Sequence, residues 1–255
     1  MSELFDLDGR VAVVTGGGRG IGRAIAVELA NAGAAVVPSA RSRDEIESVA
    51  ADIEDAGGDA LAVPADVTDS DAVSDVIDSA VDEFGGIDIV VNNAGFNPDD
   101  ALGRPETVEP ESLDRVLDVN LNGAYEVTRA AADHLLASDG GSVINVASVG
   151  GLVGLPRQHP YVASKHGLVG LTKSMSLDWA PAVRVNAVAP GYVSTVLTED
   201  LEDDDRLRRS IIDRTPLERF ADPEEIAGPV VFLASDAATY VTGSVLAADG
   251  GWTAR

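Results

Sequence analysis

The sequence of 255 residues contains no cysteine, and lysine occurs only at positions 165 and 173. The lack of cysteine excludes disulfides and thiolate metal ligands, and it fits a reducing compartment. No apolar run approaches the roughly 20 residues that a membrane-spanning helix needs. The first ten residues also lack the basic-then-apolar pattern of a signal peptide. We therefore expect a cytoplasmic protein that does not bind a membrane.

Positive charge is scarce, because 43 acidic residues stand against 18 lysines and arginines, which gives a net charge of −25. A surface of this sign disfavours nucleic acid as a partner, since phosphates would be repelled. Self-repulsion on this scale destabilises a folded chain in dilute buffer, whereas salt screens it, with a Debye length of about 3 Å at 1 M. The charge favours a halophilic protein, as in haloarchaea, and an ordinary acidic protein is the alternative.

Short β-branched runs alternate with longer amphipathic segments, and no linker or internal repeat interrupts them. This alternation predicts one α/β domain over residues 1–255, built on a doubly wound parallel sheet with helices on both faces. The expected strands are 11–15, 35–38, 60–63, 87–92, 142–146, 183–188 and 244–247. The expected helices are 21–32, 44–56, 70–84, about 113–137, 161–179 and 223–234. A long irregular stretch is expected at about 191–220.

A glycine-rich turn joins the first expected strand to the first expected helix, with the sequence TGGGRGIG over residues 15–22. Glycines allow backbone N–H groups to approach a pyrophosphate closely, and a helix N-terminus adds partial positive charge. At this place in an α/β chain the turn predicts a dinucleotide site. The residues expected to form it are Gly16, Gly18, Arg19, Gly20, Ile21 and Gly22.

The end of the second expected strand lacks the carboxylate that usually binds the adenosine ribose of NAD(H). The segment reads PSARSR over residues 38–43, and it brings Arg41 and Arg43 near Arg19 of the turn. Guanidinium groups bind phosphate in a bidentate manner. We therefore predict a preference for NADP(H), with NAD(H) still possible.

Tyr161 and Lys165 are four residues apart in an expected helix, so their side chains lie on one face. An ammonium beside a phenol favours the phenolate, and we expect it to lower the pKa of Tyr161 from about 10. Such a tyrosine is a general acid and base. Asn93 follows the fourth expected strand and Ser148 the fifth, and the ends of neighbouring parallel strands converge on one crevice.

These motifs, taken in order, resemble those of the short-chain dehydrogenase/reductase family, in its compact single-domain branch. The resemblance runs from about residue 7 to residue 252 and rests on TGxxxGIG at 15–22, DV at 66–67, NNAG at 92–95, Asn120, Ser148, YxxxK at 161–165 and PG at 190–191. It implies a sheet ordered 3-2-1-4-5-6-7, a nicotinamide cofactor, and a homotetramer or a dimer.

The resemblance also implies roles for individual residues. Ser148 would orient the substrate oxygen, Tyr161 would exchange a proton with it, and Lys165 would bind the nicotinamide ribose. Asn120 would hold a water that connects Lys165 to solvent. The remaining residues implied to contact the cofactor are Asp66, Val67, Asn93, Ala94, Gly95, Pro190, Gly191, Val193 and Thr195. No metal site is implied, and the three histidines have no metal-ligand spacing.

The segment at about 191–220 is expected to be an insertion that sets substrate specificity. Its sequence, with DPEE at 222–225 and DGGWT at 249–253, most resembles family members that act on sugars, polyols and aldonates. A sugar acid needs polar groups and a cation, for which we suggest Arg157, Gln158 and His159. The alternative is a 3-oxoacyl-thioester reductase, acting on an acyl-carrier-protein or CoA substrate. A non-catalytic dinucleotide-binding regulator is a remote third possibility.

Overall fold

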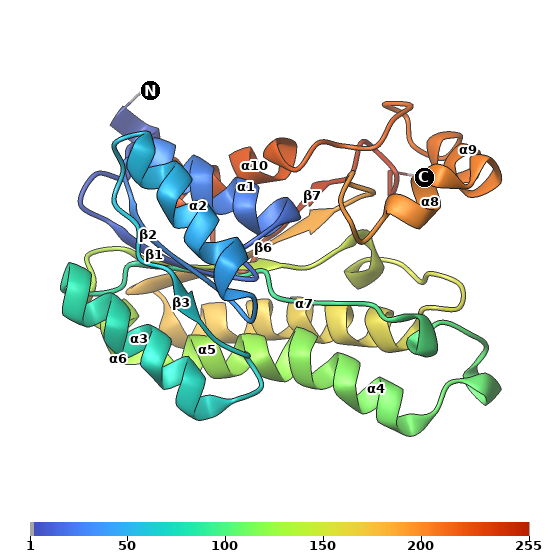
Figure 1. The fold of residues 1–255 in the computed structure, drawn as a ribbon, viewed down its shortest axis with the longest axis horizontal. Helices are drawn as coiled ribbons and strands as arrows, with labels where there is room; N and C mark the ends of the chain where they lie inside the picture. Colours follow the sequence, from blue (N-terminus) through green and yellow to red (C-terminus); the bar gives the residue numbers. More distant parts are fainter. Residues whose placement is uncertain (1–2, 255) are drawn as a thin grey trace.

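Valine- and isoleucine-rich segments form a seven-stranded parallel sheet in the computed structural model, which describes residues 3–254 (Figure 1). The strand order is β3-β2-β1-β4-β5-β6-β7, as the family resemblance implied. The strands are β1 (Val11–Thr15), β2 (Ala35–Ala40), β3 (Val63–Pro64), β4 (Ile89–Asn92), β5 (Gly141–Val146), β6 (Val183–Pro190) and β7 (Val245–Ala248).

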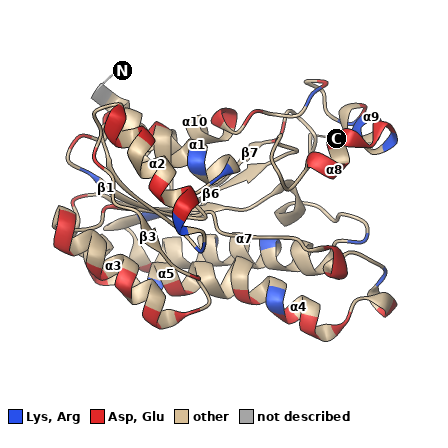
Figure 2. Ribbon diagram, in the orientation of Figure 1, with Lys and Arg blue, Asp and Glu red and all other residues tan. Residues whose placement is uncertain are grey.

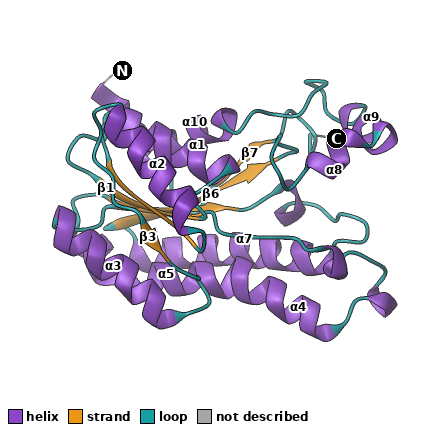
Figure 3. Cartoon of the chain, in the orientation of Figure 1, coloured by secondary structure: helices purple, strands orange, loops and turns teal. Residues whose placement is uncertain are grey.

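Helices cover both faces of the sheet (Figure 3). One layer contains α1 (Gly20–Asn31), α2 (Arg43–Asp55) and α10 (Glu224–Ala234), and the other contains α3 (Ser70–Phe84), α5 (Ala124–Ala130), α6 (Ala132–Ala137) and α7 (His159–Trp179). Successive residues of a strand point to opposite faces. Accordingly, Ala12 and Val14 of β1 pack in the first layer, whereas Val13 packs in the second. Burial on both faces explains why the strands are apolar throughout rather than alternating.

The long helix expected at about 113–137 is interrupted. It consists of α4 (Pro110–Leu117), a π-helical segment η4 (Asp118–Gly123), α5 and α6. The expectation of one continuous helix was wrong because apolar periodicity does not register the extra residue that a π-turn inserts. Such π-turns often occur at functional sites, and this one contains Asn120.

The expected irregular stretch contains two short helices, α8 (Glu199–Asp203) and α9 (Asp205–Ile212). Asp204 caps α9, because its carboxylate accepts hydrogen bonds from the backbone N–H groups of Arg206 and Leu207 at 2.9 and 3.0 Å. The acidic run at 202–205 therefore ends one helix and begins the next, which is a usual role of aspartate at an N-cap.

Acidic residues lie on helices of both layers and on α8 and α9 (Figure 2). The negative charge is thus distributed over the molecule rather than gathered in one patch. Among residues 3–254, no helix has the length and the apolar character that crossing a membrane requires.

Candidate active site

The carboxyl ends of β1, β2, β4, β5 and β6 open into a cleft of about 690 Å³. Open parallel sheets bind ligands outside the carboxyl ends of their strands, at the point where the strand order reverses. The cleft brings together most of the residues that the sequence singled out. They are Gly16, Gly18, Arg19, Gly20, Ile21, Gly22, Arg41, Asp66, Val67, Asn93, Ala94, Gly95, Ser148, Tyr161, Lys165, Pro190, Gly191, Val193 and Thr195.

The glycine-rich turn leaves no room for side chains at its centre. A Cβ on Gly22 would lie 2.1 Å from the carbonyl oxygen of Gly16, and Gly16 itself has a φ of 64°. The side-chain amide of Asn93 fixes the turn by donating to the carbonyl oxygens of Thr15 and Gly16 at 3.0 and 3.1 Å. The N-cap of α1 makes no side-chain capping bond. Its first N–H groups therefore remain available, and the turn fits a pyrophosphate.

Two of the three predicted arginines line the cleft, and each is close to a carboxylate. Arg19 lies 3.6 Å from Glu45, and Arg41 lies 3.9 Å from Asp66. Arg43 does not line the cleft. It begins α2 and pairs with Glu47 one turn later, at 3.2 Å. The helix starts there, and i, i+4 pairing holds the side chain on its outer surface. A contact between Arg43 and a 2′-phosphate stays a prediction.

Asn120 lies beneath the cleft rather than in its wall, with no exposed surface. Its side chain accepts from the backbone N–H of Phe96 at 2.9 Å and donates to the carbonyl oxygen of Phe96 at 3.0 Å and the hydroxyl of Ser164 at 3.2 Å. Asn120 thereby ties the segment after β4 to α7. Its contact with a water near Lys165 stays a prediction.

Ser148, Tyr161 and Lys165 meet at the end of β5. The Lys165 ammonium lies 5.7 Å from the centre of the Tyr161 ring and donates to the carbonyl oxygen of Val146 at 2.8 Å. Ser148 accepts a hydrogen bond from the backbone N–H of Gly150 at 3.0 Å, which orients its hydroxyl. Both the lysine and the serine are buried, with exposed fractions of 4% and 8%.

Burial controls the proton affinities of this pair. Desolvation raises the pKa of Tyr161; Ser148 opposes the shift and nearby Tyr192 adds to it. Desolvation also lowers the pKa of Lys165 from 10.5 to about 8. The expectation that the pKa of Tyr161 is lowered was wrong for the protein without cofactor, because desolvation of the phenol is the largest influence on that pKa. At neutral pH Tyr161 is therefore a neutral phenol, able to donate a proton.

The substrate end of the cleft contains residues that sequence reasoning did not assign. Tyr192 lines it and packs edge-on against Phe220 and Trp252, with ring centroids 5.9 Å away in both cases. The Arg214 guanidinium carbon in turn lies over the Trp252 ring, 4.2 Å from its centroid. These rings fix both ends of the segment 191–220. The position of Tyr192 directly after the PG pair at 190–191 was the one available signal. The other unassigned lining residues include Phe96, Asn97, Asp99, Leu102, Leu155, Val196, Leu197 and Asp200.

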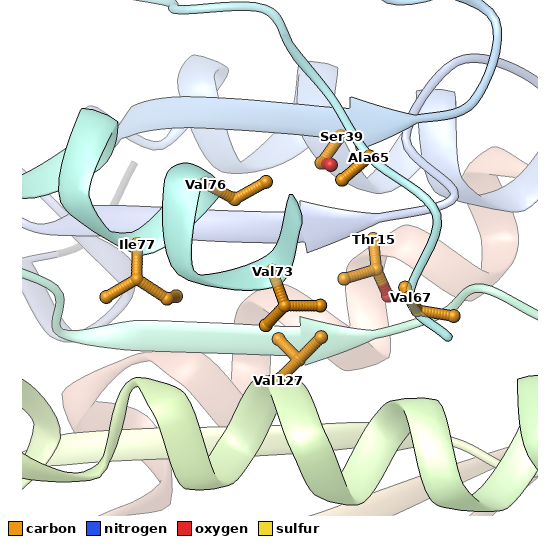
Figure 4. A pocket seen from close by; sticks show the side chains of 8 residues that line it. All are labelled: Thr15, Ser39, Ala65, Val67, Val73, Val76, Ile77 and Val127. Atoms are coloured by element: carbon orange, nitrogen blue, oxygen red, sulfur yellow. The ribbon is translucent and has the colours of Figure 1, made fainter. Parts of the chain in front are cut away.

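A separate void of about 10 Å³ lies between α3, α5 and β1, behind the cofactor end of the cleft (Figure 4). Mostly valine, isoleucine and alanine side chains line it. It has room for about one water molecule and belongs to the core.

The chain belongs to the short-chain dehydrogenase/reductase family, and it is an oxidoreductase that acts on CH–OH groups. The family model described as Enoyl-(Acyl carrier protein) reductase matches residues 16–253. The chain is 39% identical over 246 residues to the 3-oxoacyl-[acyl-carrier-protein] reductase FabG of Thermotoga maritima, covering 96% of this chain and 98% of that one.

Relatives that act on sugar acids are equally similar. The 2-dehydro-3-deoxy-D-gluconate 5-dehydrogenase of Escherichia coli is 41% identical over 258 residues, covering 99% of each chain. The structure of a gluconate 5-dehydrogenase from Burkholderia cenocepacia, in complex with NADP and tartrate, superposes with a TM-score of 0.94 at 38% identity, covering 99% of this chain and 98% of that one. The finer assignment therefore depends on the lining of the cleft.

The buried Lys165 should reduce stability at neutral pH. Below about pH 8 it is charged in the folded state despite its burial, whereas between pH 8 and 10.5 only the unfolded chain keeps the proton, so stability rises with pH across this window. We predict that Lys165→Met raises the free energy of unfolding at pH 7 by about 2 to 3 kcal/mol. The gain should disappear towards pH 10.5.

Chemical denaturation at a series of pH values measures this difference. Lys173→Met is the matched control, since Lys173 is exposed on the same helix. It should change the free energy of unfolding by less than about 0.5 kcal/mol. A Lys165→Met variant less stable than the wild type at pH 7 would contradict the expectation.

Proposed function

We propose that this protein is an NADP(H)-preferring oxidoreductase that transfers hydride between the nicotinamide and a carbonyl or secondary alcohol of a sugar, polyol or aldonate. The observation that carries the substrate class is a set of polar side chains beside Ser148 and Tyr161. Asn97, Gln158 and Tyr192 line this part of the cleft.

The cofactor preference rests on the adenosine end of the cleft. Its lining at the end of β2 and directly after it consists of Ser39, Ala40, Arg41 and Ser42, so no carboxylate stands at the strand end where NAD(H) would need one. Arg19 and Arg41 are there to bind a 2′-phosphate. Structures of related proteins contain NADP, including the gluconate 5-dehydrogenase from B. cenocepacia. NAD(H) remains a possible second cofactor.

Each catalytic residue has a role that its surroundings support. The nicotinamide, when bound, supplies or accepts the hydride. Ser148 donates a hydrogen bond to the substrate oxygen, and Tyr161 gives it a proton as negative charge develops there. Lys165 holds the ribose beside the phenol. Asn120 ties the segment after β4 to helix α7, and we assign to it the holding of a water that returns a proton to Lys165.

An unpaired acceptor supports a hydroxylated substrate. The Asn97 amide donates to the Gln158 side chain at 3.1 Å, while the buried Oδ1 of Asn97 has no hydrogen-bond partner within residues 3–254. Leaving such an atom unpaired costs about 1–3 kcal/mol. This oxygen is shielded from solvent, so a substrate hydroxyl would satisfy it once the covering side chains shift, whereas an acyl chain would not.

The charge of the lining favours a neutral sugar or polyol over an aldonate. Of the three residues suggested to bind a sugar acid, Gln158 lines the cleft, but Arg157 and His159 do not. Asp99 and Asp200 are present instead, and the lining cations are Arg19 and Arg41 at the adenosine end and the buried Lys165. A carboxylate on the substrate would meet like charge there.

A 3-oxoacyl-thioester substrate is the second candidate, supported by apolar groups in the lining. Leu102, Val196 and Leu197 line the cleft and are exposed by 42%, 69% and 59%. They could contact an acyl chain. A net charge of −25 opposes the docking of an acidic carrier protein, so this candidate ranks below the first.

We further propose that the protein is cytoplasmic and forms a homotetramer, with a dimer as the alternative. The family resemblance implies assembly through the helices around Asn120 and Tyr161. Large apolar side chains are exposed there, namely Tyr125 on α5 at 48% and Leu177 on α7 at 82%. Exposed apolar surface of this kind is typical of subunit contacts.

Activity should appear in a dehydrogenase screen run in both directions with NADP(H) and NAD(H). The panel contains neutral sugars, polyols, aldonates, acetoacetyl thioesters and simple alcohols, assayed in KCl. We expect the highest kcat/KM with NADP(H) and a neutral polyhydroxylated compound. Tyr161→Phe should lower kcat by about 10²- to 10⁴-fold while the dissociation constant of NADPH stays within about twofold of the wild type.

Two outcomes would contradict this proposal. A kcat/KM that is highest for acetoacetyl thioesters would favour the second candidate. Full activity of Tyr161→Phe would remove the catalytic assignment.

Stability should depend on salt if the protein is halophilic, as we propose. The free energy of unfolding should increase as KCl rises from 0.1 M to about 3 M, because screening removes repulsion among carboxylates on all surfaces. Equilibrium urea denaturation measures it, and an uncharged osmolyte at equal osmolality is the control. Equal stability in dilute buffer and in concentrated KCl would contradict halophily.

A further inference from the structure

Glu45 occupies an unexpected place in the adenosine end of the cleft. It lies in the first turn of α2 and lines the cleft beside Ser42. A Cβ on Gly18 would be 2.9 Å from the Cβ of Glu45 and 3.1 Å from its Oε2. Its carboxylate is therefore next to the phosphate-binding turn, and its Oε1 is 3.6 Å from the Arg19 guanidinium.

The local fold does not need this carboxylate. A glutamate at the third position of a helix can bond back to the N-cap residue. Here Ser42 forms no side-chain cap, and the Glu45 carboxylate makes no hydrogen bond within residues 3–254. Glu47, two residues further, differs in both respects. It hydrogen-bonds Arg43 at 3.2 Å and lies outside the cleft.

The other carboxylate in this region is held by its own turn. Asp66 accepts from the backbone N–H and the hydroxyl of Thr68 at 3.0 and 2.8 Å. These bonds commit Asp66 to the loop after β3, and its distance to Arg41 is 3.9 Å. Glu45 is thus the carboxylate whose charge acts mainly on the arginine of the glycine-rich turn.

We propose that Glu45 sets the selectivity of this protein between NADP(H) and NAD(H), by pairing with Arg19 in the free protein and by repelling a 2′-phosphate. The inference rests on the proposed binding of NADP(H). A phosphate entering beside Arg19 must separate that pair and then lies near the carboxylate, whereas a ribose hydroxyl carries no charge and meets neither obstacle. Glu45 therefore weakens NADP(H) binding and leaves NAD(H) binding almost unchanged, which makes a chain with two phosphate-binding arginines tolerant of both cofactors.

Direct binding measurements on two variants test this role. Dissociation constants of NADPH and NADH are measured by calorimetry for the wild type, Glu45→Gln and Glu47→Gln. The KCl series runs from the lowest concentration at which circular dichroism shows all three proteins folded, up to 3 M. Glu45→Gln should bind NADPH about five- to tenfold more tightly at the lowest salt, with a smaller gain at 3 M. Its affinity for NADH should change by less than about twofold.

Glu47→Gln removes the same charge from the same helix, but outside the cleft. It should leave both dissociation constants within about twofold of the wild type. The inference is overturned if Glu45→Gln leaves the ratio of the two constants unchanged, or if Glu47→Gln alters that ratio as much. A wild-type protein that binds neither nucleotide contradicts the proposed function itself, which is a different result.

Discussion

A buried ammonium next to a half-buried phenol is the arrangement on which this structure's chemistry depends. Lys165 and Tyr161 share one face of α7 and reach the end of β5, where the Lys165 ammonium is satisfied by the carbonyl oxygen of Val146. Burial shifts both groups towards their neutral forms. Tyr161 is therefore protonated and able to donate a proton. The burial of Lys165 lowers the free energy of unfolding. Such an exchange of stability for function is common at active sites.

The rest of the fold serves to bring this pair to a nucleotide. Parallel strands end together, so the turn after β1, the NNAG segment after β4 and Ser148 after β5 face one cleft. The π-helical segment η4 directs Asn120 beneath that cleft, where it fixes the backbone of Phe96. The positive charge of the lining is limited to Arg19, Arg41 and Lys165. In a molecule of net charge −25, these cations define where an anionic cofactor fits.

Apolar periodicity and glycine spacing were enough to predict the parallel sheet and the glycine-rich turn, whereas the strand order was implied by the family resemblance. These features depend on local sequence and on the geometry of parallel strands. The sequence could not predict properties that depend on the surroundings of a side chain. The pKa of Tyr161 follows from its desolvation, and neither Arg43 nor Arg157 lines the cleft. The π-turn around Asn120 and the aromatic support of Tyr192 are likewise tertiary features.

Ultraviolet titration of Tyr161 in the cofactor-free protein tests the central claim most directly. The difference between the wild type and Tyr161→Phe isolates the ionisation of this phenol, and the same difference is then measured in a Lys165→Met background. If burial controls the phenol, its pKa lies above the ordinary value of 10.0 in both backgrounds. A pKa below 10.0 in the wild type that rises when Lys165 is replaced would contradict the account and restore the ammonium as the dominant influence.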